Sequence, residues 1–146
     1  MSREYPDHPR VGVGAVVLHE DRVLLVKRGN APARGKWSLP GGLVNLGETT
    51  RAAVVREVAE ECGLTITVAE VAGVVDRVTR DAEGRVKYHY VLVDYLAHPE
   101  STQIRSGSDA AEARWVEIGR VAELDVTEGL VDMIRRAQAL GGGTGA

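Results

Sequence analysis

Phenylalanine is absent from this chain of 146 residues, and aromatic residues make up only 4% of it. The core must therefore depend on aliphatic side chains, and the hydrophobic content of 44% is close to that of an ordinary folded domain. The single cysteine, Cys62, excludes an internal disulfide and a zinc site built from cysteines. The length suits one domain, and a reducing cytoplasm is the simplest compartment for it.

The chain also lacks an excess of positive charge and any long apolar run. Its 18 basic and 21 acidic residues give a formal net charge of −3, which provides no long-range attraction for DNA or RNA. No apolar run approaches the roughly 20 residues that a membrane-spanning helix needs. Residues 1–10 are polar and lack the apolar segment of a signal peptide. We therefore expect a cytoplasmic protein without a nucleic-acid polymer or a membrane as partner.

Apolar runs and turn residues divide the chain into interleaved strands and helices. Strands are expected over 11–18, 23–27, 37–39, 66–80, 86–97 and 113–117, helices over 50–62 and 127–140, and a polar loop over 98–110. Because hairpins alternate with helical segments, the pattern predicts an α/β fold with a mixed sheet. The expected organisation is an N-terminal extension over 1–10, one domain over 11–140 and a flexible tail over 141–146.

The helix expected over 50–62 carries a cluster of acidic side chains. Residues three and four positions apart are neighbours on a helix, so Glu57, Glu60 and Glu61 share one face. The opposite face is expected to be buried, and its residues are Ala52, Val55, Ala59 and Cys62, with Val58 at the border. Like charges on one face destabilise an isolated helix. A positive charge is therefore expected beside the three glutamates.

Two sources of positive charge are available to this acidic face. Arg56 offsets part of the charge, with Glu48 as its expected partner, and a hard divalent cation offsets the rest. Magnesium suits such a face because it prefers carboxylate and water oxygens. The alternative is a solvated acidic face without a ligand, and three glutamates alone favour that alternative.

The residues around the helix decide between these alternatives. Gly42 is followed by Glu48, then by Arg56-Glu57-Val58, Glu60-Glu61 and Gly63-Leu64, at the spacing of the Nudix box. The segment GLVNLGETTRAAVVREVAEECGL matches that box at every specified position. The preceding GKWSLPGG and the order of strands extend the likeness over about 11–140. The chain thus resembles Nudix hydrolases, and most of all compact bacterial ADP-ribose pyrophosphatases.

This resemblance implies a fold, a metal site and an assembly. The fold is a mixed β-sheet sandwiched between α-helices, and the assembly is a homodimer. The implied metal is Mg²⁺, with Mn²⁺ as a substitute, and the implied metal-site residues are Glu57, Glu60, Glu61 and Gly41. Arg56 would orient the glutamates, and Glu48 would assist them. Many relatives carry Glu where Asn45 stands, so one carboxylate of the common pattern is missing.

The resemblance leaves the general base open, because its position varies within the family. The base is either a box glutamate, Glu60 or Glu61, or an acid in a later loop. Asp109 and Glu112 are expected in such a loop, just before Trp115. Ordinary loop charge is an equally good interpretation of these two acids.

Substrate contacts are expected from the basic loop that precedes the box, from later aromatic side chains, and from Asp109 in the later polar loop. Arg28 and Arg34 are candidates for phosphate binding, although a solubilising role explains at least some of the basic residues there. Trp37 either stacks on a base or fills the core, and the core is favoured. His89 is either a substrate contact or a structural histidine.

The wider resemblance implies a small nucleotide substrate, ADP-ribose, cleaved to AMP and ribose 5-phosphate. One alternative is a nucleoside triphosphate pyrophosphatase that removes dNTPs or oxidised dNTPs from the nucleotide pool. A second alternative, from another functional class, is a sensor that binds a nucleotide without cleaving it. The complete box argues against the sensor.

Overall fold

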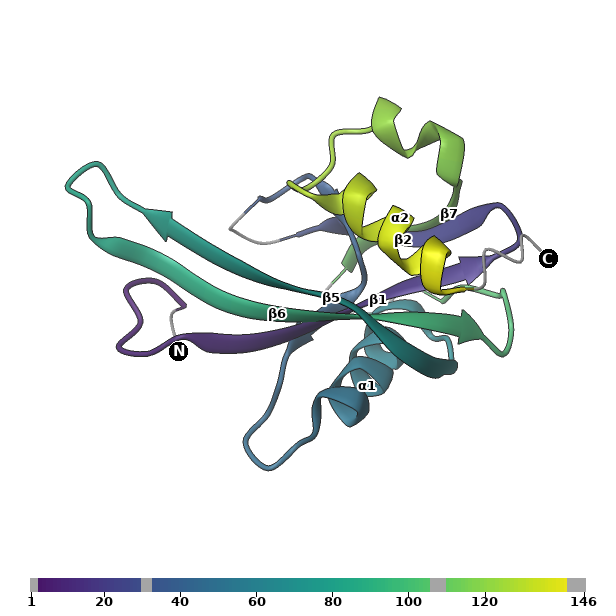
Figure 1. Ribbon diagram of the computed structural model, residues 1–146, viewed down its shortest axis with the longest axis horizontal. Helices are drawn as coiled ribbons and strands as arrows, with labels where there is room; N and C mark the ends of the chain where they lie inside the picture. Colours follow the sequence, from purple (N-terminus) through teal and green to yellow (C-terminus); the bar gives the residue numbers. More distant parts are fainter. Residues whose placement is uncertain (1–2, 30–32, 106–109, 142–146) are drawn as a thin grey trace.

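The computed structural model describes residues 3–29, 33–105 and 110–141. Its elements are β1 (Arg10–His19), β2 (Arg22–Arg28), β3 (Trp37–Ser38), β4 (Gly41–Leu43), α1 (Thr50–Cys62), β5 (Ile66–Arg80), β6 (Val86–Pro99), β7 (Ala110–Glu117), the 3₁₀ helix η1 (Ile118–Glu123) and α2 (Leu130–Leu140). Figure 1 shows a twisted sheet with α1 on one side and α2 on the other. The α/β class and the mixed sheet are as predicted. The tail predicted over 141–146 lies, apart from its first residue, outside the described residues.

Strand β1 is the centre of the sheet. The order is β3-β2-β1-β6-β5, with β4 paired to β1 and β7 paired to β2. The pairing of β1 with β6 is parallel, whereas β1 pairs antiparallel with β2 and with β4. Strands β5 and β6 form a long antiparallel hairpin that extends beyond both helices (Figure 1).

Two aliphatic cores lie on the two faces of this sheet. Because successive strand residues point to opposite faces, β1 contributes Val17 to the core under α1 and Val16 to the core under α2. Both side chains are fully buried. Valine, leucine, isoleucine and alanine thus supply most of the apolar packing that phenylalanine supplies elsewhere. None of the helices in the described part of the chain is long and apolar enough to cross a membrane.

Helix α1 begins and ends where the sequence predicts, but other boundaries differ. The polar loop expected over 98–110 is shorter, because β6 continues to Pro99 and β7 begins at Ala110. Long-range pairing extends both strands: Pro99 pairs with Ile66, and Ala110 pairs with Arg28. The last helix begins at Leu130 rather than at 127, after Gly129 in the left-handed region. Strand β4 and η1 were not predicted.

The buried face of α1 is also different from the prediction. Ala52 and Ala59 are exposed, and the buried residues are Ala53, Val54, Val58 and Cys62. Alanines lie on several sides of this helix, so apolarity alone does not determine its rotation. The bulkier Val54 and Val58 occupy the core instead. The buried stripe therefore lies beside the acidic stripe rather than opposite it.

Candidate active site

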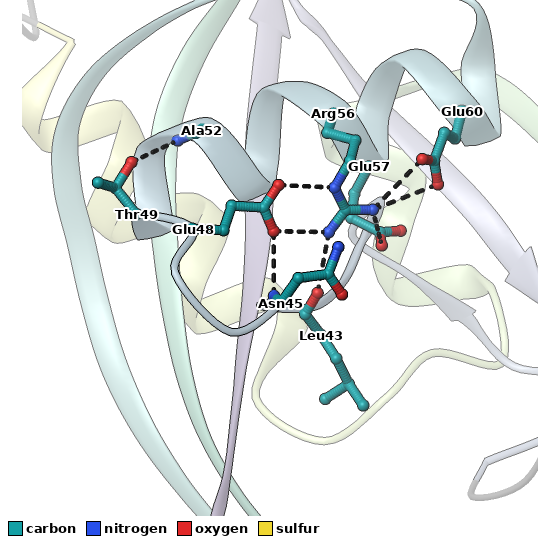
Figure 2. Close-up of polar contacts among 8 residues, drawn as sticks. All are labelled: Leu43, Asn45, Glu48, Thr49, Ala52, Arg56, Glu57 and Glu60. Atoms are coloured by element: carbon teal, nitrogen blue, oxygen red, sulfur yellow. Dashed lines mark hydrogen bonds and ion pairs between the residues drawn. The ribbon is translucent and has the colours of Figure 1, made fainter. Parts of the chain in front are cut away.

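Hydrogen bonds hold the loop before α1 in place at the first turn of the helix. The side chain of Thr49 accepts a hydrogen bond from the backbone N–H of Ala52 at 3.1 Å, which makes Thr49 the N-cap. The backbone N–H of Asn45 donates to Glu48 Oε1 at 3.0 Å. Figure 2 shows both contacts. They hold Glu48 at the side of the helix that carries the glutamates.

Arg56 is the centre of an ion-pair network. Its Nε donates to Glu48 Oε2 at 2.7 Å and its Nη2 to Glu48 Oε1 at 2.9 Å, a bidentate pair (Figure 2). Its Nη1 donates to Glu57 Oε1 at 2.8 Å and more weakly to Glu60 Oε1 at 3.3 Å. Nη2 also donates to the carbonyl oxygen of Leu43 at 3.1 Å. The expected Glu48–Arg56 pair is confirmed, and it connects the loop to the helix.

This network shifts the ionisation of its members. The hydrogen bonds from Arg56, followed by the one from the Asn45 N–H, lower the pKa of Glu48 to about 2. The same partner raises the pKa of Arg56 still further above its ordinary value. Glu48 is therefore an anion at neutral pH, and both of its oxygens accept hydrogen bonds from the guanidinium.

Glu57 and Glu61 lie against the two glycines of β4. The backbone N–H of Gly41 donates to Glu61 Oε1 at 2.7 Å. A Cβ atom on Gly42 would lie 2.4 Å from the carboxylate carbon of Glu57, so any other residue there would displace that carboxylate from its present position. Gly41 is equally restricted, because a Cβ there would lie 1.9 Å from the carbonyl oxygen of Val13. The glycine pair thus allows two carboxylates, one helical turn apart, to approach the strand backbone.

Glu60 differs from these two glutamates in its exposure. Its side chain is 51% exposed, whereas that of Glu57 is 15% exposed. Among residues 3–29, 33–105 and 110–141, no three His, Cys, Asp or Glu side chains converge into a ready-made metal cluster. Carboxylate and backbone carbonyl oxygens are nevertheless the donors that Mg²⁺ takes. Glu57, Glu61 and the backbone of Gly41 offer such donors in one place, so the residues fit a hard divalent cation.

Arg28, at the end of β2, lies within electrostatic range of Glu61. Burial is the main factor that lowers its pKa, and the charges of Arg3 and Arg77 act in the same direction. The charges of Tyr90 and Glu61 act in the opposite direction. A partly buried guanidinium close to Glu61 is suited to bind a phosphate that a metal also binds.

Comparison with known proteins agrees with this geometry. The model of the NUDIX domain matches residues 8–137. The chain belongs to the Nudix family. An ADP-ribose pyrophosphatase of Methanocaldococcus jannaschii is 35% identical over 117 residues, which are 80% of this chain and 67% of the relative. A Bacillus subtilis protein provisionally named as an 8-oxo-dGTP diphosphatase is 32% identical over 111 residues, 75% of this chain and 68% of that one.

A solved structure gives the same result for the fold. The crystal structure of a MutT NUDIX hydrolase from Burkholderia pseudomallei superposes with a TM-score of 0.74 at 33% identity. The superposition covers 89% of this chain and 98% of that chain. This Nudix hydrolase is therefore a pyrophosphohydrolase of a family that uses divalent metal ions.

Some residues predicted for the site of this Nudix hydrolase lie elsewhere. Glu112 is in β7 rather than in a loop, because β7 pairs with β2 from Ala110 onward. Its carboxylate accepts a hydrogen bond from Arg114 Nη2 at 2.7 Å, which lowers its pKa. On β7 the alternate residues Ala113 and Trp115 pack against the core under α1, so Glu112 points to the other face. Asp109 lies outside the described residues.

The remaining candidates are also separated from the glutamates. Trp37 is 6% exposed and belongs to the core under α2, with the Arg114 guanidinium 4.7 Å from its ring centre. This burial supports the core interpretation over base stacking. His89 lies on the projecting part of the hairpin, paired with Val78. Arg34 is exposed, beside the segment 30–32.

Two features of this Nudix hydrolase fall outside the predicted site. A shallow hollow of about 360 Å³ lies at the β1–β2 turn and includes His19, Arg22 and Trp115 in its lining, away from the α1 carboxylates. We place the site at α1 because the carboxylates and the Nudix box are there. Sequence reasoning also gave no role to Asp94, which is buried on β6. The available signal was an acidic residue in an otherwise apolar strand segment.

Proposed function

We propose that this Nudix hydrolase cleaves the diphosphate of ADP-ribose with Mg²⁺ and releases AMP and ribose 5-phosphate. The observation that carries the proposal is the placement of the Glu57 and Glu61 carboxylates against the Gly41-Gly42 backbone. The M. jannaschii relative supports ADP-ribose as the substrate. The assignments of individual residues that follow are part of the proposal.

Glu57, Glu61 and the Gly41 carbonyl would hold the metal ion, with Glu60 beside them. When bound, Mg²⁺ would neutralise the diphosphate charge and lower the pKa of the attacking water. Arg56 fixes the direction of the glutamates, because its guanidinium is itself held by both oxygens of Glu48. Arg28 would bind a phosphate oxygen through its planar guanidinium.

We assign the general base to Glu60 rather than to Glu112. Glu60 is half exposed and its contacts with Arg56 are long, at 3.3 and 3.4 Å, so it is the less restrained box carboxylate. Glu112 is engaged by Arg114 and points to the face away from α1. A carboxylate near the attacking water can take its proton as the nucleophile adds to phosphorus.

The test is product analysis with a substrate panel. The protein is incubated with Mg²⁺ and ADP-ribose, ADP-sugars, dinucleotides, dNTPs or oxidised dNTPs, and the products are identified by mass. We expect AMP and ribose 5-phosphate from ADP-ribose, loss of activity with a chelator, and recovery when Mg²⁺ is added. Intact ADP-ribose after prolonged incubation with either Mg²⁺ or Mn²⁺ would refute the proposal.

A second candidate is removal of oxidised dNTPs, favoured by the B. subtilis relative. The same panel separates the two functions by their products. Release of pyrophosphate and a nucleoside monophosphate from 8-oxo-dGTP, at a higher kcat/KM than for ADP-ribose, would make this second function the correct one.

We further propose a homodimer that covers an exposed apolar face of the sheet. Val11, Val74 and Val78 are 42%, 57% and 45% exposed. Val11 is on β1 and the other two are on β5, and their strand registers put all three on the face of the sheet that α1 covers elsewhere. The hairpin of β5 and β6 extends beyond α1 (Figure 1). Exposed apolar patches commonly mark protein interfaces. Light scattering should give twice the chain mass of 15.7 kDa, and Val74→Asp should give the monomer; a wild-type monomer at assay concentration would contradict the dimer.

We also place the protein in the cytoplasm. Cys62 is a free, buried thiol, and burial raises its pKa to about 12. Such a thiol neither needs nor readily forms a disulfide, which suits a reducing compartment. Fractionation of the source cells would check the location, and recovery in an exported fraction would contradict it.

A further inference from the structure

Strand β6 carries two buried polar groups that the proposed chemistry does not use. Asp94 is 9% exposed, and in the part of the chain that the structure describes no hydrogen bond reaches its carboxyl group. The hydroxyl of Tyr90 is buried and likewise has no hydrogen-bond partner among the described residues. The two side chains point to the same face of β6, since their spacing is even. Buried polar groups almost always have partners, so the Tyr90 hydroxyl and the Asp94 carboxyl group are candidates for contact with a bound molecule.

Asp94 lies in a row with two glycines, and α2 covers one of them: a Cβ atom on Gly73 would lie 2.9 Å from Met133 Cε and 3.0 Å from Arg136 Nη1. Asp94 pairs with Gly14 on β1 and with Gly73 on β5, so neither neighbour in its row has a side chain. A Cβ atom on Gly14 would lie 2.5 Å from Asp94 Oδ1, which means that the carboxyl group leans over that glycine. The side chain of Leu39 is the other close neighbour of this position.

Asp94 lies two strands away from Gly41, on the face of the sheet that α2 covers. Gly14 pairs with Asp94 on one side and with Gly41 on the other, and Gly41 donates to Glu61. Adjacent strands are about 4.8 Å apart, so Asp94 and Gly41 are separated by roughly 10 Å across the sheet. That separation is comparable to the length of one phosphate joined to one pentose. A group bound at Asp94 can therefore belong to the molecule whose phosphate is bound at α1.

An arginine of β5 lies on the same face as Asp94. Arg77 pairs with Tyr90 across the β5–β6 ladder, and its Nη2 donates to the carbonyl oxygen of Glu128 at 2.9 Å. Its charge acts on Asp94 and on Arg28. Arg28 in turn lies within electrostatic range of Tyr90 and Glu61. Arg28 is thus within electrostatic range both of Glu61 and of Arg77 and Tyr90, which lie on the face of Asp94.

We infer that Asp94 is a substrate-binding residue whose two carboxyl oxygens accept hydrogen bonds from the vicinal hydroxyls of a ribose. A carboxyl group repels phosphate, so its ligand is an O–H or N–H donor. A ribose offers two adjacent donors without a charge, which matches two acceptor oxygens. A 2′-deoxyribose offers only one. This inference rests on the proposed function, and it makes Asp94 a determinant of selectivity for ribose over deoxyribose.

The test compares ADP-ribose with two analogues. One contains 2′-deoxyadenosine and the other a terminal 2-deoxyribose, so together they identify which ribose is bound. Wild-type kcat/KM should fall roughly 10- to 100-fold on one of them, as expected for the loss of a hydrogen bond to a charged group. Asp94→Asn should lose a similar factor on ADP-ribose and should no longer discriminate against that analogue. Asp76→Asn, an exposed carboxylate on β5, is the matched control and should behave as wild type.

The possible outcomes are distinct. Equal wild-type rates on all three substrates, or full discrimination retained by Asp94→Asn, would overturn the inference while leaving the hydrolase function in place. A wild-type enzyme that hydrolyses none of the three substrates would overturn the proposed function and this inference with it.

Discussion

Replacing Asp94 with asparagine should stabilise the folded protein at neutral pH and have less effect near pH 4. Burial raises the pKa of Asp94 from 3.8 to about 6, and the charge of Arg77 offsets only part of this effect. A raised carboxyl pKa means that folding favours the protonated form. The contribution of the protonated Asp94 carboxyl group to the free energy of unfolding is therefore fully present below pH 3.8 and is lost as the pH rises through 6.

The size of the effect follows from the difference between the two pKa values. The difference is about two pH units, and each unit corresponds to about 1.4 kcal/mol. The ionised carboxylate thus costs the wild-type fold about 3 kcal/mol at pH 8, and asparagine has no such cost. Asparagine can differ from aspartate in packing as well, but that difference is independent of pH.

Urea unfolding at pH 4.5, 5.5, 6.5 and 8 measures this prediction for the wild type and for Asp94→Asn. The free energy of unfolding of the variant, relative to the wild type, should rise between pH 4.5 and 6.5 and then level off, with the slope m unchanged. Asp76→Asn should show a difference below about 0.5 kcal/mol at each pH, as exposed substitutions usually do. A flat difference for Asp94→Asn would refute the reasoning. Greater stability combined with weaker ADP-ribose hydrolysis would be the pattern of a residue kept for function.

Three further predictions concern α1 and its loop. Glu57→Gln and Glu61→Gln should retain the wild-type circular dichroism spectrum and lose about 10² or more in kcat, by analogy with the loss of a charge-stabilising group; unchanged turnover in either would remove that residue from the metal site. Gly42→Ala should displace the Glu57 carboxylate, because the new Cβ would lie 2.4 Å from its carbon, and should reduce kcat/KM and raise the Mg²⁺ concentration needed for half activity. Gly119→Ala, where no atom lies within 4 Å of the new Cβ, is its control, and equal activity of the two variants would contradict the steric argument. Thr49→Ala should lower the free energy of unfolding by about 1 kcal/mol through loss of the N-cap, and a urea midpoint equal to that of the wild type would argue against the cap.

The features that the sequence predicts well are those with local causes. Helix α1 has the predicted bounds because Thr49 caps its first turn and Gly63, at φ 68°, ends it in the left-handed region. The pairing of Arg56 with Glu48 was also predictable, since the spacing of the box brings a loop acid and a helical base together. The roles of these residues in metal binding and catalysis stay predictions.

The predictions that were wrong concern features that depend on contacts between distant segments of the chain. Glu112 was expected in a loop because the sequence around it is polar, but pairing of β7 with β2 places it in a strand. The rotation of α1 depends on which alanines meet the sheet, and Ala52 and Ala53 are indistinguishable in sequence. Strand β4 has only three residues, two of them glycine, so no local propensity could reveal it.

The position of Gly14 between Gly41 and Asp94 has a mechanical consequence. The spacing of these three residues is set by hydrogen bonds between paired strands, which are among the least deformable contacts in a protein. The backbone positions of Gly41 and Asp94 therefore cannot move apart through loop motion, and only side-chain rotation can adjust the distance between the Glu61 and Asp94 carboxyl groups. A molecule with one methylene inserted between its phosphate and its sugar should therefore bind less well than ADP-ribose, because side chains would have to leave their preferred rotamers to reach both of its ends.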